Sequence, residues 1–173
     1  MTIFFTADHH FGQGAARGLF KRPFADTAAM DEAMVARWNA AVGPADTVWH
    51  LGDLAIRFSR DRVEALLASL NGAKHLIAGN NDPAATREAT GWASVAEFHE
   101  TEVDGTAVVL CHYALRVWNG QGKAAWNLHG HSHGRLRPLT RQADVGVDTF
   151  DFRPVTLDAI KRARRRGPRG DGG

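Results

Sequence analysis

Short apolar runs, each followed by a glycine or a polar residue, recur along the chain. They occupy residues 3–7, 47–51, 75–78, 107–111 and 126–129. Runs of four or five apolar residues between turn signals are typical of buried strands. The polar residue after each run is therefore expected at the carboxyl-terminal end of a strand.

Helical periodicity fills the segments between these runs. Apolar residues recur every four positions from Met30 to Val42, with Asp26 or Thr27 as the expected N-cap. A second apolar stripe covers residues 63–70, and further helices are expected near residue 83 and from residue 156. The alternation predicts the α/β class with parallel strand pairs. The strand-rich stretch from residue 98 favours a mixed sheet, or two packed sheets, over a simple doubly wound one.

Length and cysteine usage limit the protein classes. A chain of 173 residues predicts one domain over residues 1–160, followed by a basic, flexible tail at 161–173. Cys111 is the single cysteine, so a disulfide scaffold is excluded. No apolar run approaches the length of a membrane span, and the start of the chain lacks a basic signal-peptide region. We expect a cytoplasmic protein without a membrane partner.

The net charge of +2 is unevenly distributed. Residues 161–173 hold six Lys/Arg and one Asp, whereas residues 1–160 hold 15 basic and 18 acidic groups. Nucleic-acid binding through the tail is the less favoured interpretation, because a polyanion would need a second, structured basic patch. The favoured alternative is a solvated helix end whose cations suit the helix dipole.

Seven polar residues after the apolar runs form a candidate metal site. They are Asp8, His10, Asp53, Asn80, His112, His131 and His133. In an extended segment, residues two apart point the same way, so the pairs at 8/10 and 131/133 converge. Imidazole with carboxylate suits Mn, Fe or Zn better than Ca or Mg, and the lack of thiolate argues against structural zinc. Seven ligands suit two ions that share one carboxylate.

The ordered blocks carrying these residues resemble the calcineurin-like metallophosphoesterase superfamily, especially its small microbial and phage-type members. The blocks are Asp8-His9-His10, Gly52-Asp53, Gly79-Asn80-Asn81-Asp82, His112 and Gly130-His131-Ser132-His133. The resemblance implies a four-layer α/β/β/α sandwich of two β-sheets flanked by helices. It implies one ion on Asp8, His10, Asp53 and His133. It implies a second ion on Asp53, Asn80, His112 and His131.

The resemblance also implies an enzyme, a phosphoesterase in which a hydroxide bridging two divalent ions attacks phosphorus, and Mn²⁺ is favoured for activity. Asn80, Asn81, Asp82 and His112 are the expected catalytic residues. Asn81 stands where the family usually has His, and an amide cannot supply a proton. We favour a phosphodiester, such as a cyclic or short nucleotide, as substrate. A phosphomonoesterase and a catalytically weakened metal-binding scaffold remain as alternatives.

Two loops that follow ligand-bearing strands are expected to border the substrate. The first carries Arg17 and Arg22, and the second carries Arg116 and Trp118. Arg116 with Trp118 could pair a phosphate with a stacked base, while the alternative is a solvated loop whose Trp118 packs on the body.

Overall fold

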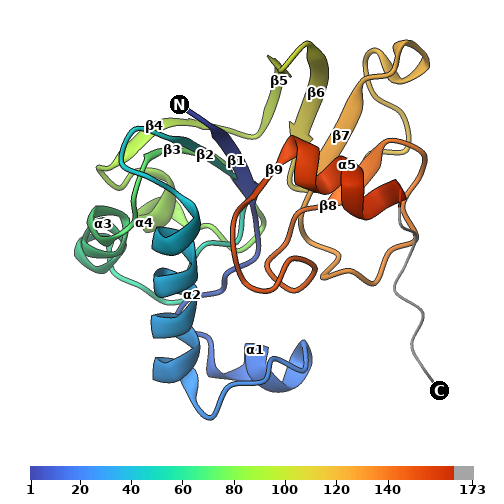
Figure 1. The fold of residues 1–173 in the computed structure, drawn as a ribbon. Helices are drawn as coiled ribbons and strands as arrows, with labels where there is room; N and C mark the ends of the chain where they lie inside the picture. The colour runs from blue at the N-terminus through green and yellow to red at the C-terminus, as the bar shows by residue number, and fades with distance from the viewer. Residues whose placement is uncertain (166–173) are drawn as a thin grey trace, which may run out of the picture.

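The computed structural model describes residues 1–165 (Figure 1). The strands of the amino-terminal half form a five-stranded sheet together with one strand from near the carboxyl terminus. Its order is β4 (Trp92–Ala96), β3 (Ala73–Ile77), β2 (Thr47–His50), β1 (Ile3–Thr6) and β9 (Val155–Thr156). Strands β1 to β4 pair in parallel, and β9 is antiparallel to β1. The carboxyl ends of β1, β2 and β3 therefore meet at one edge.

A four-stranded sheet follows along the chain. Its order is β5 (Phe98–Val103), β6 (Thr106–Cys111), β7 (Trp126–His129) and β8 (Gln142–Asp144). β5 pairs antiparallel with β6, and β6, β7 and β8 pair in parallel. Both sheets are mixed, which confirms the expectation of two packed mixed sheets.

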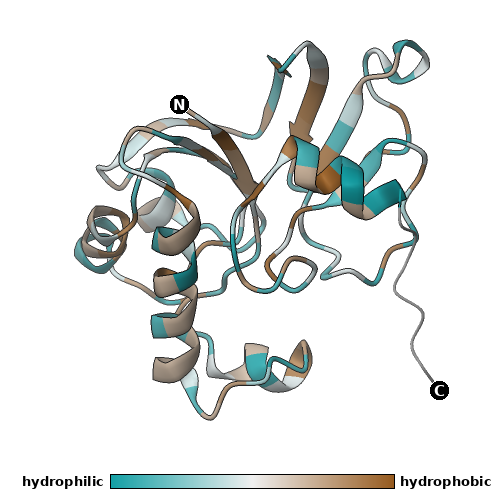
Figure 2. Cartoon of the chain, in the orientation of Figure 1, coloured by the Kyte–Doolittle hydropathy of each residue, from teal (hydrophilic) through white to brown (hydrophobic). Residues whose placement is uncertain are grey.

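The two sheets bury a common core because alternate residues of each strand face inward. Phe5 and Trp49 of the first sheet pack in one cluster with Val108, Leu110 and Leu128 of the second. In Figure 2, β1 and β6 are largely brown, in keeping with this burial. The opposite face of the first sheet is left for the helices.

The helices are α1 (Gly14–Leu19), α2 (Thr27–Ala41), α3 (Arg60–Ser69), α4 (Ala84–Arg87) and α5 (Leu157–Arg165), with a short 3₁₀ turn at Gln121–Lys123. In α2 the predicted four-residue repeat is the buried face, and Trp38 packs against Val48 of β2. The Asp26 side chain accepts a hydrogen bond from the backbone N–H of Ala29, which confirms the predicted cap. Helices thus flank the paired sheets, and the predicted fold class is confirmed.

The carboxyl-terminal helix joins the core through Leu157 and Ile160. Residues 161–165, which the sequence assigned to the tail, continue α5, while the rest of that predicted tail lies outside the described residues. No helix within residues 1–165 is long and apolar enough to cross a membrane.

Candidate metal centre

Two groups of side chains with metal-ligand chemistry lie where the strands of the two sheets end. Asp8, His10 and His133 form one group, and Asp53, His112 and His131 form the other. Within each group the potential ligand atoms lie within 4.8 Å of one another. Six of the seven predicted ligands are therefore brought together as two triads.

Asp53 lies between the two groups. Its Oδ2 is 3.6 Å from Nε2 of His10, and its Oδ1 is 3.7 Å from Nε2 of His112. Asn80, the seventh predicted ligand, places its Oδ1 3.0 Å from the same His112 nitrogen. Each oxygen of Asp53 thus faces a different triad, which is the arrangement that a shared carboxylate needs.

The backbone is held in a costly conformation at five of these residues. Asp8, His10, Asp53, His131 and His133 all have left-handed φ angles, between 48° and 64°. Such angles typically cost about 1–3 kcal/mol at a non-glycine residue, and they persist where the surrounding structure enforces them. Their concentration at one site indicates that side-chain placement there outweighs local backbone preference.

Glycines allow the loops to approach one another closely. A Cβ on Gly52 would lie 2.7 Å from the Gly79 backbone, and a Cβ on Gly79 would lie 2.3 Å from Oδ1 of Asp53. Both distances are below normal contact, so the loops after β2 and β3 can meet only without side chains at these positions.

Several buried atoms of the site match what a cation would require. Among the described residues, Oδ1 of Asp8 and Nε2 of His10 are buried without a hydrogen-bond partner. Nδ1 of His112 donates to the Leu51 carbonyl, 2.7 Å away, so in the neutral ring Nε2 carries the lone pair. That lone pair faces the oxygens of Asn80 and Asp53. Converging acceptors of this kind fit a divalent metal ion.

Burial shifts the pKa values of two ligands away from their charged forms. Burial, reinforced by the nearby carboxylates of Asp144 and Asp53, raises the pKa of Asp8 well above its usual value. Burial and the neighbouring His133 lower the pKa of His10 to about 4, although Asp53 opposes this shift. His10 is therefore neutral at physiological pH, the state in which imidazole binds metals. A cation would offset the repulsion among the carboxylates.

Asp148 orients His133 and was given no role by the sequence analysis. Nδ1 of His133 donates to Asp148, 2.8 Å away, which leaves Nε2 free for a ligand. Arg22 donates two hydrogen bonds to the same carboxylate and further ones to the backbone carbonyls of Asp8 and His9. Carboxylates commonly fix metal-binding histidines in this way. The role of Asp148 follows from its proximity to His133 in space.

Asp144 supports the loop that carries His131 and His133. Its Oδ2 accepts from the Ser132 hydroxyl at 2.6 Å and from the Gly134 N–H at 2.8 Å. Its Oδ1 accepts from the Gly146 N–H at 2.7 Å. No sequence pattern predicts this contact, although Asp144 lies at the end of β8.

The remaining predicted catalytic residues lie around Asp53. Asp82 is buried and accepts from the backbone N–H groups of Asp53, Leu54 and Gly79, so it positions the loops after β2 and β3. Asn81 donates its side-chain N–H to Oδ2 of Asp53 at 2.7 Å and its backbone N–H to Oδ1 at 2.9 Å. Asp82 therefore holds the backbone at Asp53, and Asn81 contacts the Asp53 carboxylate itself.

The structure places the four residues that were predicted to contact substrate in different environments. Arg22 is buried in the network above, and Arg17 donates to the carbonyls of Phe24 and Ala25. Trp118 is buried and its indole donates to the Ala125 carbonyl, as the packing alternative anticipated. Arg116 is exposed, and its contact with substrate stays a prediction.

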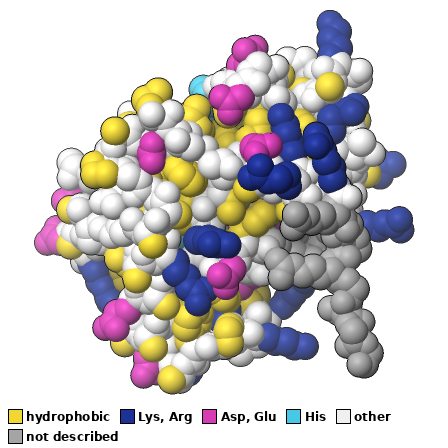
Figure 3. All heavy atoms as spheres, in the orientation of Figure 1, with side chains coloured by type: hydrophobic (Ala, Val, Ile, Leu, Met, Phe, Trp, Pro, Cys, Tyr) yellow, Lys and Arg dark blue, Asp and Glu magenta, His cyan; other side chains and the backbone are white. Residues whose placement is uncertain are grey.

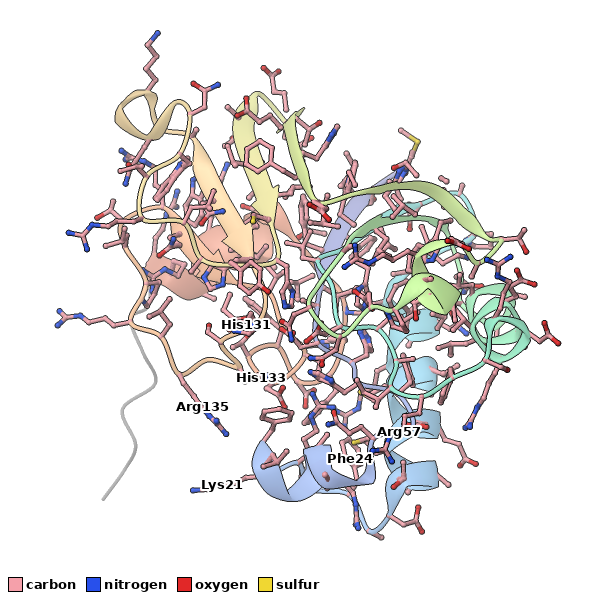
Figure 4. The ribbon with its side chains drawn as sticks, turned by 180° about the vertical axis from the view of Figure 1, so that it is seen from behind. Lys21, Phe24, Arg57, His131, His133 and Arg135 are labelled. Atoms are coloured by element: carbon pink, nitrogen blue, oxygen red, sulfur yellow. The ribbon has the colours of Figure 1, made fainter. Side chains whose placement is uncertain are left out.

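The two triads differ in cover, and we name them accordingly. The covered group (Asp8, His10 and His133) lies under Phe20, whose ring stacks on His133 with centroids 3.5 Å apart. The open group is Asp53, His112 and His131, of which His131 is exposed. Figure 4 shows His131 and His133 between the second sheet and α1, with Lys21 and Arg135 at the outer rim.

A pocket of about 380 Å³ adjoins the open group. Asn80, His112 and Arg87 line it, and Phe98 and Tyr113 contribute aromatic side chains that are about half exposed. Arg87 donates to the carbonyls of Gly79 and Asp82, which fixes the loop that bears Asn80. The volume lies within the range of small-molecule sites.

Comparison with known proteins agrees with this geometry. The model of the calcineurin-like phosphoesterase superfamily domain matches residues 1–147. The Gene 66 protein of Mycobacterium phage L5 is 37% identical over 190 residues, covering 90% of each chain. The uncharacterized protein MJ1445 of Methanocaldococcus jannaschii is 28% identical over 178 residues, covering 95% of this chain and 92% of its own.

Solved structures share the fold. The protein of unknown function AQ665 from Aquifex aeolicus superposes with a TM-score of 0.75 at 19% identity, covering 93% of this chain and 98% of its own. A structure described as a novel archaeal phosphodiesterase gives a TM-score of 0.50 at 18% identity, covering 84% and 82%.

Proposed function

Because the chain belongs to the calcineurin-like phosphoesterase superfamily and is a metal-dependent phosphoesterase, we propose that it hydrolyses phosphodiesters at a pair of divalent cations. The observation that carries this proposal is the position of Asp53, whose two oxygens face different triads. A single ion would leave one triad without a role. Two ions sharing Asp53 would use both.

In this proposal the covered group and Asp53 hold one ion, and the open group with Asn80 holds the other. The mixed nitrogen and oxygen ligands suit Mn, Fe or Zn, and we expect Mn²⁺ to support the highest activity. Such ions, when bound, supply positive charge for a phosphate and lower the pKa of water. The protein's own contribution is to hold seven ligand side chains in place before substrate arrives.

Asn81 determines how much proton transfer the protein can supply. Its amide donates a hydrogen bond but has no proton to give to a leaving group near neutral pH. Esters whose leaving groups depart without protonation are therefore the favoured substrates. This supports activated diesters over monoesters of simple alcohols, and it is also the one observation that favours a weakened scaffold.

The pocket beside the open group supports a diester with a planar substituent. A phosphodiester has a second ester group that must lie beside the metal site, and the pocket offers space there. Phe98 and Tyr113 present aromatic surface on which a ring could stack. A nucleoside attached to the phosphate fits these two requirements.

The experiment combines metal analysis with a small substrate comparison. Purified protein is analysed for bound metals, and its hydrolysis of bis(p-nitrophenyl) phosphate and p-nitrophenyl phosphate is measured with Mn²⁺. We expect two metal ions per chain and faster turnover of the diester. Asp53→Asn should lower kcat at least about 10²-fold, because both triads lose their shared oxygen charge.

Asp151→Asn is the matched control, because Asp151 is an exposed aspartate that pairs with Arg37. It should retain metal content and turnover. Faster monoester hydrolysis would reverse the substrate assignment. Full metal loading without turnover of either ester would indicate the scaffold, and full activity of Asp53→Asn would refute the site itself.

A further inference from the structure

Positive charge is concentrated in one part of the chain. Residues 112–143 contain five Lys/Arg and no Asp or Glu, whereas residues 1–111 contain nine Lys/Arg and 14 Asp/Glu. Helix α5 adds four Lys/Arg and one Asp. Figure 3 shows dark-blue side chains gathered over α5 and the neighbouring part of the second sheet. The charge of this surface is positive, whereas residues 1–111 carry more acidic than basic side chains.

A pocket of about 390 Å³ lies within this basic surface. It is lined by Trp126, Thr140, Arg141, Lys161, Arg164 and Arg165. Four of these six side chains are cationic, and among the described residues no Asp or Glu lines the pocket. The acidic residue of α5, Asp158, pairs with Arg162 instead. Among residues 1–165, no acidic side chain in the pocket therefore neutralises its four cations.

Three of the four pocket cations are held by hydrogen bonds to the protein. Lys161 donates to the Thr106 hydroxyl, Arg164 to the Leu139 carbonyl and Arg141 to the Gln121 carbonyl. Within residues 1–165, the Nε atoms of Arg141 and Arg164 are buried and have no hydrogen-bond acceptor. A buried cationic donor without an acceptor is costly, and an anion in the pocket would satisfy it.

The helix dipole does not account for this arrangement. Cations in the last turn of a helix are stabilised by the dipole, which accounts for Arg164 and Arg165 but not for Lys161. Arg141 comes from the residue before β8, however, and adds a fourth charge from a different element. Its convergence with the helix cations indicates a site for negative charge.

The pocket is separate from the metal centre. Trp126 begins β7, whereas His131 and His133 of the metal centre follow the other end of that strand. Arg141 immediately precedes β8, the neighbouring parallel strand. Four residues of strand span about 10 Å. None of the pocket residues belongs to either triad.

We propose that this pocket binds the phosphate backbone of single-stranded nucleic acid. A polymer offers successive phosphates to the fixed cations, and the half-buried indole of Trp126 offers a stacking surface for an unpaired base. The pocket and the surface around it are the structured basic patch that polyanion binding requires. The proposal concerns binding away from the metal centre and does not depend on the hydrolytic function.

The test measures binding of a fluorescein-labelled oligothymidylate to the full chain by anisotropy. EDTA is present, so that metal-dependent cleavage does not interfere. Removing two pocket charges in the double variant Arg141→Gln/Arg165→Gln should weaken binding about tenfold at low salt. It should also reduce the slope of log K against log salt by about 1.4, the loss expected for two phosphate contacts.

The matched control is Arg37→Gln/Arg60→Gln, which removes two exposed arginines of α2 and α3 and has the same net charge. It should change the affinity less than twofold. Hydrolysis of bis(p-nitrophenyl) phosphate should be unchanged in both double variants, which shows that they fold and separates this proposal from the proposed function.

Three results would overturn the proposal. Equal weakening in both double variants would show that only net charge matters. Failure of the wild-type chain to bind the oligonucleotide at low salt would remove the site. Binding of inorganic phosphate or thymidine monophosphate as tight as that of the oligonucleotide would assign the pocket to a small anion instead of a polymer.

Discussion

The covered group of the metal centre lies beneath the ring of Phe20, whereas the open group faces the pocket walled by Phe98 and Tyr113. Both contain carboxylate and imidazole, so their ligand chemistry is nearly the same. What differs is access: the covered group has no exposed member, and the open group presents His131 to solvent. In the proposed two-ion centre, the covered group would therefore retain its ion and the open group would meet substrate.

The surroundings of the two groups support this division. In the covered group His133 is held by Asp148, which Arg22 holds in turn. In the open group His112 is held by a neutral backbone carbonyl, that of Leu51. A carboxylate partner makes an imidazole a stronger ligand than a carbonyl does. We therefore expect tighter binding in the covered group.

His112→Ala is expected to have the largest effect on this comparison. It removes a ligand of the open group and should lower kcat at least about 10²-fold, since the substrate side of the centre loses charge stabilisation. The covered group should keep its ion, so metal content should fall from two ions to one. Elemental analysis beside diester turnover checks both. Loss of both ions would mean that the two halves are not separable.

Asp148→Asn should have the next largest effect, within the covered group. An amide cannot fix His133 as strongly, and metal affinity should fall about 10- to 100-fold. Arg22, whose side chain is fully buried, would also lose its charged partner, at a cost of about 3–5 kcal/mol. Chelator competition measures the first effect and thermal unfolding the second.

Asp151→Asn provides the control for Asp148→Asn, because it changes an exposed carboxylate. It should leave metal affinity and melting temperature unchanged. A stability loss in Asp148→Asn with unaltered metal affinity would show that Asp148 serves only the Arg22 ion pair.

The sequence predicted the covered and open groups better than it predicted their surroundings. The ligands follow apolar runs, and adjacent parallel strands bring their carboxyl ends together, which predicted that Asp8 and Asp53 lie near each other. His112 follows a strand of the other sheet, and its place in the site was implied by its ligand chemistry and by the family resemblance. Asp148 and Phe20 follow no such run. Their contacts with His133 come from loops whose paths depend on tertiary packing, and no local pattern encodes them.

Short elements escaped prediction for a related reason. The two-residue β9 and the three-residue β8 are too short to show periodicity, and α1 has one buried residue, Ala16. Arg22 and Trp118 were assigned to the substrate side because loops carry them. The structure buries both, since neighbouring carbonyls and carboxylates satisfy their polar atoms.

Tyr113→Ala tests the open side with a smaller effect. Loss of a stacking surface should raise KM for bis(p-nitrophenyl) phosphate about five- to thirtyfold, equivalent to about 1–2 kcal/mol. Methyl p-nitrophenyl phosphate lacks the second ring and should be less affected. Equal changes for the two diesters would indicate that Tyr113 acts on His112 or His131, whose rings its own ring contacts.

Phe20→Ala should have the smallest effect. It tests whether shielding from solvent, as distinct from metal ligation, retains the ion of the covered group. The ring contributes no ligand atom, but it stacks on His133 and lies 5.6 Å from the His10 ring. We expect excess chelator to remove metal in two phases, a faster one from the open group and a slower one from the covered group. Removal of the Phe20 ring opens the covered group to water and to chelator, so the slower phase should accelerate a few-fold. The faster phase and kcat at saturating Mn²⁺ should change less than twofold. Leu19→Ala, at the exposed neighbouring position, should leave both phases as they are. If Phe20→Ala left the slow phase unaltered, retention would have to come from the Asp148–His133 contact instead of from exclusion of solvent.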